Sequence, residues 1–187
     1  MLALGMLLGS IPVGYLLVRL STGSWPKETG LGALDVRRRL GVAGALLVPV
    51  LDVAKGLAPV WIAKGNLDSP LMVVLVGVVT ILSHCFPYWF LFRPMGKGMA
   101  VGLGVVLALS PAAGLLTACV WLLSLLLSQR LSVATMIAAV SIPIWFRVFG
   151  SPSAFVWFGL AGLVCVVISH LPNIACLAKG TELRFRL

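Results

Sequence analysis

The sequence has few charged residues and very few acidic ones. Only 10% of its 187 residues are charged, and Asp and Glu together number 5. A soluble domain is about one quarter charged, so this chain lacks the polar surface of a water-soluble protein. Its hydrophobic share of 60% and its mean hydropathy of +1.12 exclude a disordered chain as well. The composition therefore places most of the chain in a lipid bilayer.

Patterns typical of metal sites, disulfide frameworks and covalent nucleophiles are also lacking. The four cysteines have no metal-like spacing and all fall in apolar stretches, which predicts small buried residues. They are Cys85, Cys119, Cys165 and Cys176. The sequence contains neither a nucleophile elbow nor a P-loop. We therefore expect no metal and no cofactor.

Long unbroken apolar runs dominate what is present, and they favour spanning helices over alternating strands. A span needs about 20 apolar residues, so 187 residues accommodate at most about seven. We expect an all-α integral membrane bundle of about seven helices, forming a single transmembrane domain over residues 1–187. The first apolar run lacks the basic start and cleavage pattern of a signal peptide, which predicts a span. The expected spans are about 2–20, 41–63, 70–90, two short helices within 99–127 broken at Ser110-Pro111, 131–148 and 153–170.

Basic residues are distributed unequally between the two sides of this arrangement. One side holds Arg19, Lys27, Arg37, Arg38, Arg39, Arg93, Lys97, Arg130, Lys179, Arg184 and Arg186, and the other holds only Lys64 and Arg147. The positive-inside rule then predicts an outside N-terminus and a cytoplasmic C-terminus. A single helix over 99–127 would send the basic tail outside, which argues against six spans. The net charge of +9 is interpreted as this bias, so we expect no nucleic-acid partner.

The first polar cluster combines an interrupted span with an arginine run. The motif Gly9-Ser10-Ile11-Pro12-Val13-Gly14-Tyr15 breaks the first span, and Arg37-Arg38-Arg39 follows in a polar segment over 21–40. The break indicates either close helix packing, which we favour, or backbone exposed to a cavity. The arginine run is either a topology anchor or a phosphate grip, because guanidinium binds phosphate oxygens bidentately.

The second cluster is His84-Cys85-Phe86-Pro87 followed by Gly96-Lys97-Gly98. Glycines beside a lysine let the backbone approach an anion closely while the lysine supplies charge. The loop also precedes the helix expected from Met99, and helix N-termini attract anions. A lysine that snorkels to the interface is the alternative, and His84 is either a ligand or an interfacial histidine.

Two further groups of polar residues complete the inventory. His170, Asn173, Gly180 and Glu182 follow the last span, where Pro172 favours a helix end near His170. Asp52 and Lys55 lie within a span and are three residues apart, so each is the other's nearest partner. Because ionisable groups inside a membrane are costly, we predict a structural ion pair.

These motifs, in this order, resemble the bacterial acyl-phosphate-dependent glycerol-3-phosphate acyltransferase family over nearly the whole chain. They are Gly-Ser-Ile-Pro-x-Gly-Tyr, Asp52-x-x-Lys55-Gly56, His84-x-Phe86-Pro87 with Gly96-Lys97-Gly98, and His170-x-x-Asn173-Ile174 with Gly180-Thr181-Glu182. The resemblance implies a seven-span enzyme of the cell inner membrane with a cytoplasmic active site. It also implies transfer of a fatty acyl group from acyl phosphate to the 1-hydroxyl of glycerol 3-phosphate, giving lysophosphatidic acid and phosphate.

The resemblance implies roles for individual residues as well. Catalysis would rest on Lys97, His170 and Asn173. Substrate would be bound by Arg38, His84, Gly96, Gly98 and Glu182. The base would be either a phosphate oxygen of the donor or His170, and neither acyl-CoA, a carrier protein nor a metal would be required.

This chain departs from the family pattern in the first motif. Where the family has Gly-Ser-Gly-Asn, the chain has Lys27-Glu28-Thr29-Gly30, and where it has Ala-Thr-Asn, the chain has Ala33-Leu34-Asp35. A serine and both asparagines are thus missing, while Arg38 stays in register. These departures keep two alternatives open: a paralogue that uses another acceptor, and a non-catalytic membrane protein on the same scaffold. The sequence contains no signal from which an oligomeric state could be predicted.

Overall fold

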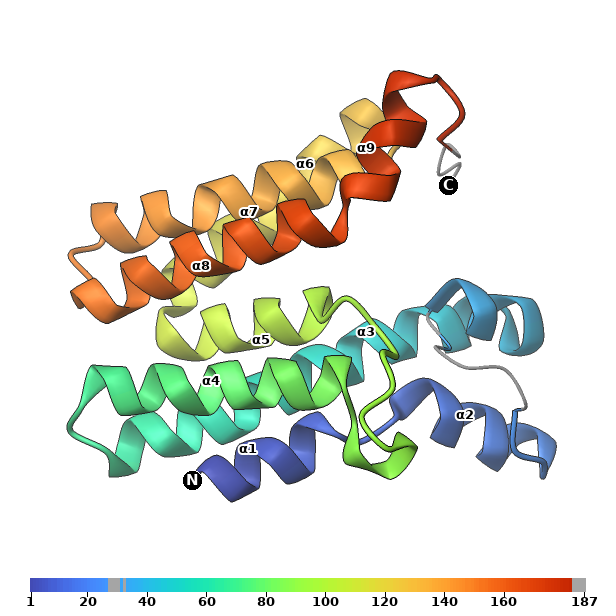
Figure 1. Cartoon of the computed structure of the whole chain (residues 1–187), viewed down its shortest axis with the longest axis horizontal. Coiled ribbons are helices and arrows are strands. Elements are labelled where there is room, and N and C mark those ends of the chain that lie inside the picture. The colour runs from blue at the N-terminus through green and yellow to red at the C-terminus, as the bar shows by residue number, and fades with distance from the viewer. Residues whose placement is uncertain (27–30, 32, 183–187) are drawn as a thin grey trace. The chain divides into compact units, whose positions relative to one another are not determined.

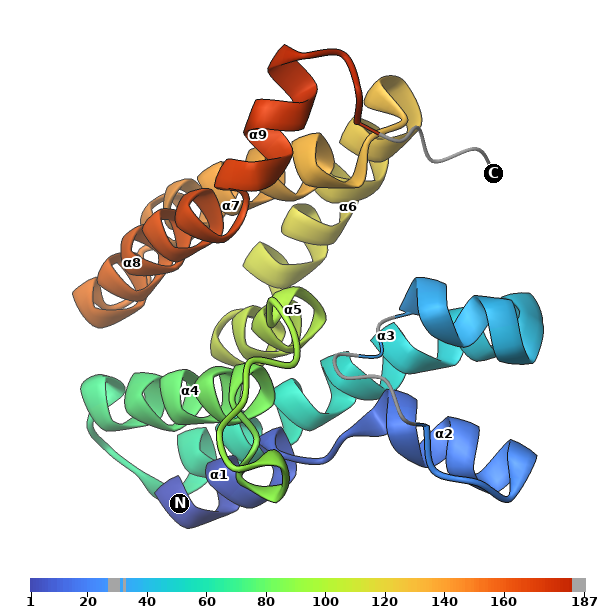
Figure 2. The ribbon, with the colours of Figure 1, turned by 45° about the vertical axis from the view of Figure 1, so that its right-hand side comes forward.

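The computed structural model describes residues 1–26, 31 and 33–182, and over these residues all regular secondary structure is helical. The chain divides into two compact units, Met1–Ala108 and Leu109–Leu187. Figure 1 follows the chain through both units, and Figure 2 gives a second view of the same ribbon.

The first expected span is a broken helix. It consists of α1 (Leu2–Gly9) and α2 (Val13–Thr22), which are bent by 44° relative to each other. Pro12 precedes α2 and has no backbone N–H, so it cannot continue the hydrogen-bond ladder of α1. The predicted interruption of the span is therefore confirmed.

Helix α3 (Ala33–Asn66) begins earlier than the expected span over 41–63. The arginine run, expected in a polar segment, forms helical turns that end in a kink at Gly41, where φ is 71°. Arginine is a good helix former, and Asp35 in the first turn suits the positive end of the helix dipole. These local preferences explain why the helix extends beyond its apolar part.

The remaining elements of the first unit are α4 (Pro70–Cys85), the short 3₁₀ helix η1 (Tyr88–Phe90) and α5 (Met99–Leu109). Helix α4 packs against α1 and α3. Glycines bring the backbones close: a Cβ on Gly9 would lie 2.3 Å from the carbonyl oxygen of Thr80 in α4. A Cβ on Gly104 in α5 would lie 2.1 Å from the carbonyl oxygen of Val53 in α3. Such small-residue contacts are typical of membrane helices.

The second unit contains α6 (Pro111–Ser128), α7 (Leu131–Val148), α8 (Ser153–Ser169) and α9 (Leu171–Ala178). Helix α7 packs against both α6 and α8 (Figures 1 and 2). The predicted break at Ser110-Pro111 is confirmed, since the Ser110 hydroxyl caps α6 by accepting a hydrogen bond from the amide of Ala113.

Helix α9 was not predicted. The helix end expected near His170 is present, but α9 starts one residue later at an angle of 56° to α8. Pro172 lies in the first turn of α9, where its missing N–H costs no hydrogen bond. The same proline therefore ends one helix and begins the next.

Among the described residues, four helices are long and apolar enough to span a membrane, or six if each bent pair forms one span. The short helix expected before Ser110 is α5, which has 11 residues. The prediction of buried cysteines is wrong: Cys119, Cys165 and Cys176 are exposed and Cys85 is half-buried. A thiol on the outer surface of a membrane bundle faces lipid, so its apolar character does not require burial in protein.

Candidate active site

The loop after α4 folds back onto the end of that helix. The amide of Met95 donates a hydrogen bond of 2.9 Å to the carbonyl of Cys85. The glycine–lysine loop (Gly96, Lys97 and Gly98) then lies against the last turn of α4. A Cβ on Gly96 would be 2.9 Å from Nε2 of His84. The structure thus brings His84 together with this loop, as the sequence predicts.

The second glycine of the loop has a conformational role. Gly98 has a φ of +70°, and a Cβ there would lie 3.0 Å from Sγ of Cys85. Both the left-handed backbone and the space favour glycine. The side chain of Lys97 is exposed between the two glycines, immediately before α5 begins at Met99. A cation and the N-terminus of a helix are therefore adjacent, which suits an anionic group.

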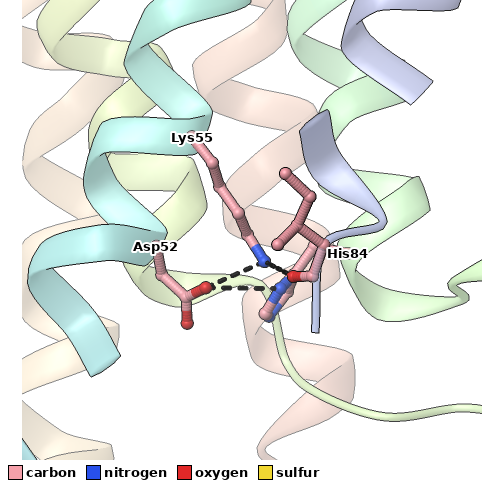
Figure 3. Close-up of polar contacts among 4 residues, drawn as sticks. Asp52, Lys55 and His84 are labelled. Atoms are coloured by element: carbon pink, nitrogen blue, oxygen red, sulfur yellow. Dashed lines mark hydrogen bonds and ion pairs between the residues drawn. The ribbon is translucent and has the colours of Figure 1, made fainter. Parts of the chain in front are cut away.

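A cluster of ionisable residues lies beside this loop (Figure 3). Asp52 and Lys55 are both buried, and Nζ of Lys55 is 2.8 Å from Oδ1 of Asp52. The predicted ion pair is therefore confirmed. Sequence reasoning missed two further contacts of the pair. Oδ1 of Asp52 is 3.9 Å from Nδ1 of His84, and Nζ of Lys55 donates a hydrogen bond of 2.7 Å to the carbonyl of Ile11.

One sequence signal pointed to the Ile11 contact. Pro12 lies at the break between α1 and α2, and the carbonyls at the break of a membrane helix need hydrogen-bond partners from neighbouring segments. A buried lysine within a span is a suitable donor for such a carbonyl. No comparable local signal connects Asp52 with His84, because these residues belong to different helices.

Arg38 lies in the first turns of α3, and its side chain is 83% exposed. Its Nη1 is 4.0 Å from Oδ1 of Asp35, one turn earlier on the helix. The altered motif over 27–30 lies outside the described residues, as do the side chains of Ala33 and Leu34. A Cβ on Gly14 would lie 2.6 Å from the carbonyl oxygen of Leu31, so the backbone of Leu31 lies against the start of α2.

The second unit holds the other predicted site residues. His170 lies between α8 and α9 with only 4% of its surface exposed. Its Nδ1 is 2.9 Å from the carbonyl oxygen of Val166 and 3.1 Å from Oγ of Ser169. A carbonyl can only accept, so Nδ1 carries the proton in this hydrogen bond. In a neutral ring Nε2 is then the atom that accepts protons.

Asn173 and Glu182 lie beyond His170. Asn173 is half-buried in the first turn of α9. Oε1 of Glu182 accepts a hydrogen bond from the hydroxyl of Ser132 at the start of α7, and Oε2 is buried with no hydrogen-bond partner among the described residues. The predicted site residues are thus divided between the units: Arg38, His84 and the glycine–lysine loop lie in the first, and His170, Asn173 and Glu182 lie in the second.

The fold and these groups define a helical integral membrane protein with cationic and glycine-rich segments suited to anions. The family model described as glycerol-3-phosphate acyltransferase matches residues 1–180. The glycerol-3-phosphate acyltransferase of Synechococcus sp. (strain JA-2-3B'a(2-13)) is 39% identical, with 96% of this chain and 90% of that protein covered. The enzyme of the same name from Desulforamulus reducens (strain ATCC BAA-1160 / DSM 100696 / MI-1) is 35% identical, with 95% and 90% covered.

Solved structures agree with these relatives. The chain is similar to the glycerol 3-phosphate form of the integral membrane acyltransferase PlsY (YgiH), with a TM-score of 0.87 at 32% identity, covering 99% of this chain and 94% of that one. For the lysophosphatidic acid form the TM-score is 0.89 at 33% identity, with 99% and 93% covered. The chain therefore belongs to the glycerol-3-phosphate acyltransferase family. Its class of activity, a membrane glycerol-3-phosphate acyltransferase of phospholipid synthesis, is the one that the sequence motifs predict.

Proposed function

We propose that this chain transfers a fatty acyl group from acyl phosphate to the 1-hydroxyl of glycerol 3-phosphate. The bond between the acyl carbon and the phosphate oxygen breaks, and a bond between that carbon and the hydroxyl oxygen forms. The hydroxyl proton passes to a base, and inorganic phosphate leaves with the bonding electron pair. Because acyl phosphate is a mixed anhydride and already activated, positioning and charge neutralisation suffice and no protein nucleophile is needed.

The glycine–lysine loop is the observation that carries this proposal. Lys97 is exposed between two glycines and directly precedes the N-terminus of α5. Such a loop offers backbone N–H groups and one full positive charge to a phosphate. His84 supports the loop from the side of α4, and Arg38 supplies a guanidinium for the phosphate of the acceptor.

His170 is one of two candidates for the base, and an oxygen of the donor phosphate is the other. The hydrogen bond from Nδ1 of His170 to Val166 supports the first candidate because it leaves Nε2 as the proton acceptor. Asn173, in the following helix, supplies amide donors for the reacting carbonyl. Oε2 of Glu182, which has no hydrogen-bond partner among residues 1–26, 31 and 33–182, supports a role in accepting a hydrogen bond from a substrate hydroxyl.

We also propose that the active site faces the cytoplasm in a cell inner membrane, with the N-terminus outside. The support is the distribution of basic residues, of which nearly all fall on the side that carries Arg38, Lys97 and Lys179. Glycerol 3-phosphate is charged and cannot cross a bilayer unaided, so a cytoplasmic site gives this enzyme direct access to its acceptor.

A reconstituted assay tests the reaction. Purified protein in vesicles receives palmitoyl phosphate and radiolabelled glycerol 3-phosphate, and lysophosphatidic acid and inorganic phosphate are quantified. We expect the two products in equal amounts, and none of the lipid when palmitoyl-CoA replaces the acyl phosphate or glycerol replaces the acceptor. Consumption of acyl phosphate without lysophosphatidic acid would contradict the proposal and favour the paralogue with another acceptor.

A further inference from the structure

We propose that Asp52 and Lys55 are positioning residues for acyl transfer, which hold His84 and, through it, the glycine–lysine loop. This inference rests on the proposed role of Lys97 in binding the donor phosphate. Both residues are buried, with 8% of Asp52 and 7% of Lys55 exposed, whereas the side chain of Lys97 is exposed. Their effect on the reaction is therefore indirect.

Asp52 orients the ring of His84. Its Oδ1 lies 3.9 Å from Nδ1 (Figure 3). This distance is longer than a hydrogen bond, so the carboxylate acts on the ring through its charge. The charge favours the ring orientation and the tautomer that place an N–H toward Asp52. On the opposite side of the ring, Nε2 is the atom nearest to where a Cβ on Gly96 would lie. The ring in turn occupies the space where Gly96 has no side chain, so a change in ring orientation displaces the loop.

Lys55 connects the same carboxylate to the break between α1 and α2. Its Nζ contacts Asp52 at 2.8 Å and donates to the carbonyl of Ile11 at 2.7 Å. The break therefore depends on α3 for one of its hydrogen bonds, as broken membrane helices require. One ion pair thus joins three segments of the first unit: the break, α3 and the end of α4.

Helix α3 is also held against the element that follows Lys97. A Cβ on Gly56, the residue after Lys55, would lie 2.2 Å from the carbonyl oxygen of Val101 in α5. Two turns of backbone are therefore in direct contact, with no side chain between them to absorb a shift. Movement of the Asp52–Lys55 pair would reach the loop from both of its ends, through His84 and through α5.

A merely structural pair does not need this arrangement. Two buried charges are costly to desolvate, and apolar residues of similar volume often stabilise a protein equally well. A pair that is charged and also contacts a site histidine and a helix break is better explained by a requirement for fixed geometry.

The test is a double-mutant cycle between the pair and Lys97. The neutral double variant Asp52→Asn/Lys55→Met removes both charges together, so it avoids leaving one unpaired charge buried. We expect kcat for palmitoyl phosphate to fall about tenfold with a melting temperature close to that of the unaltered chain. In the Lys97→Ala background we expect the same double variant to lower kcat less than about twofold, because the loop no longer has a charge to position.

Lys64→Met is the matched control, because Lys64 also lies on α3 and its Nζ donates to a backbone carbonyl, that of Ala108 at 3.4 Å. We expect unchanged kinetics for it. Asp52→Glu, which keeps the charge, should recover part of the lost kcat, a rescue that simple packing does not predict. If the neutral variant has normal kcat, or if its loss multiplies fully with that of Lys97→Ala, the positioning role is wrong. Failure of the unaltered chain to make lysophosphatidic acid would instead contradict the proposed function.

Discussion

Two glycines near the candidate site shape it because they have no side chain. Gly96 leaves room for the ring of His84, and Gly98 adopts a φ of +70° that side chains disfavour. The lysine between them is thereby presented on a short, closely supported stretch of backbone. A flexible loop of the same charge would hold a phosphate less well, because binding would first have to order it.

Lys97→Ala should lower turnover far more than stability. Removing one electrostatic contact to a transition state commonly costs about 3 kcal/mol, or a factor of about 100 in rate. The side chain is exposed, so the unfolding free energy should change by less than about 0.5 kcal/mol. Initial rates with palmitoyl phosphate and melting temperature in detergent give the two quantities, with Lys64→Ala as the control. Normal kinetics for Lys97→Ala would identify this lysine as a snorkelling residue.

The first motif predicts weak binding of the acceptor. Arg38 has a carboxylate 4.0 Å away, that of Asp35, where the family pattern has asparagine. Restoring Gly-Ser-Gly-Asn over 27–30, with Leu34→Thr and Asp35→Asn, should lower the KM for glycerol 3-phosphate by about 100-fold or more. Each hydrogen bond regained to a charged group contributes roughly 1.5–3 kcal/mol. If the unaltered chain saturates at micromolar glycerol 3-phosphate, the absence of these hydrogen-bond donors does not weaken binding of the acceptor.

At the scale of elements, glycine contacts decide how the helices of the first unit pack. In a bilayer, lipid is as apolar as the helix surfaces, so close backbone approach contributes more than hydrophobic burial does. The contact between α3 and α5 involves Gly56 and Gly104, and it holds α5 where the glycine–lysine loop ends. Packing and the site are therefore coupled.

Gly104→Ala should destabilise the protein by about 1–3 kcal/mol, because its Cβ would meet the backbone of α3 at 2.1 Å and no side chain can move aside. Gly102→Ala is the matched control two residues away on the same helix. Its Cβ would meet only Cδ1 of Ile81, at 4.0 Å, so the gain in helix propensity should leave stability equal or higher. Thermal unfolding of both variants in one detergent checks the order. Equal melting temperatures would contradict the close contact.

At the scale of the whole molecule, the unequal distribution of basic residues is the basis for the proposed orientation in the membrane. In the seven-span arrangement predicted from the sequence, Lys64, at the end of α3, and Arg147, at the end of α7, fall on one side, and the basic residues outside the spans otherwise fall on the other. The positive-inside rule applies to short loops near span ends, which describes the connections of this chain.

Single cysteines introduced into a variant without native cysteines test this orientation. Positions 64 and 151 should react with a membrane-impermeant maleimide added to intact cells, whereas positions 27, 130 and 184 should react only after the membrane is permeabilised. Positions 27 and 184 lie outside the described residues, but labelling reports their side directly. Labelling of position 130 from outside, or of 64 only after permeabilisation, would reverse the proposed topology.

Helix ends were predictable wherever a local signal encodes them. The hydroxyl of Ser110 caps α6, which begins at Pro111, and α7 covers the expected range 131–148. These ends were predictable because capping and proline act within one helical turn. Helix α9 was missed because Pro172 suits a helix end and a helix start equally well, and only packing selects between them.

The ion pair of Asp52 and Lys55 shows where local information stops. Residues three apart on a helix share a face, so the pair itself could be inferred from spacing. The contact of Lys55 with Ile11 joins residues 44 apart, and that of Asp52 with His84 joins two helices. Such contacts follow from the crossing of helices, which depends on where glycines let backbones approach, and spacing along the chain contains no measure of that distance.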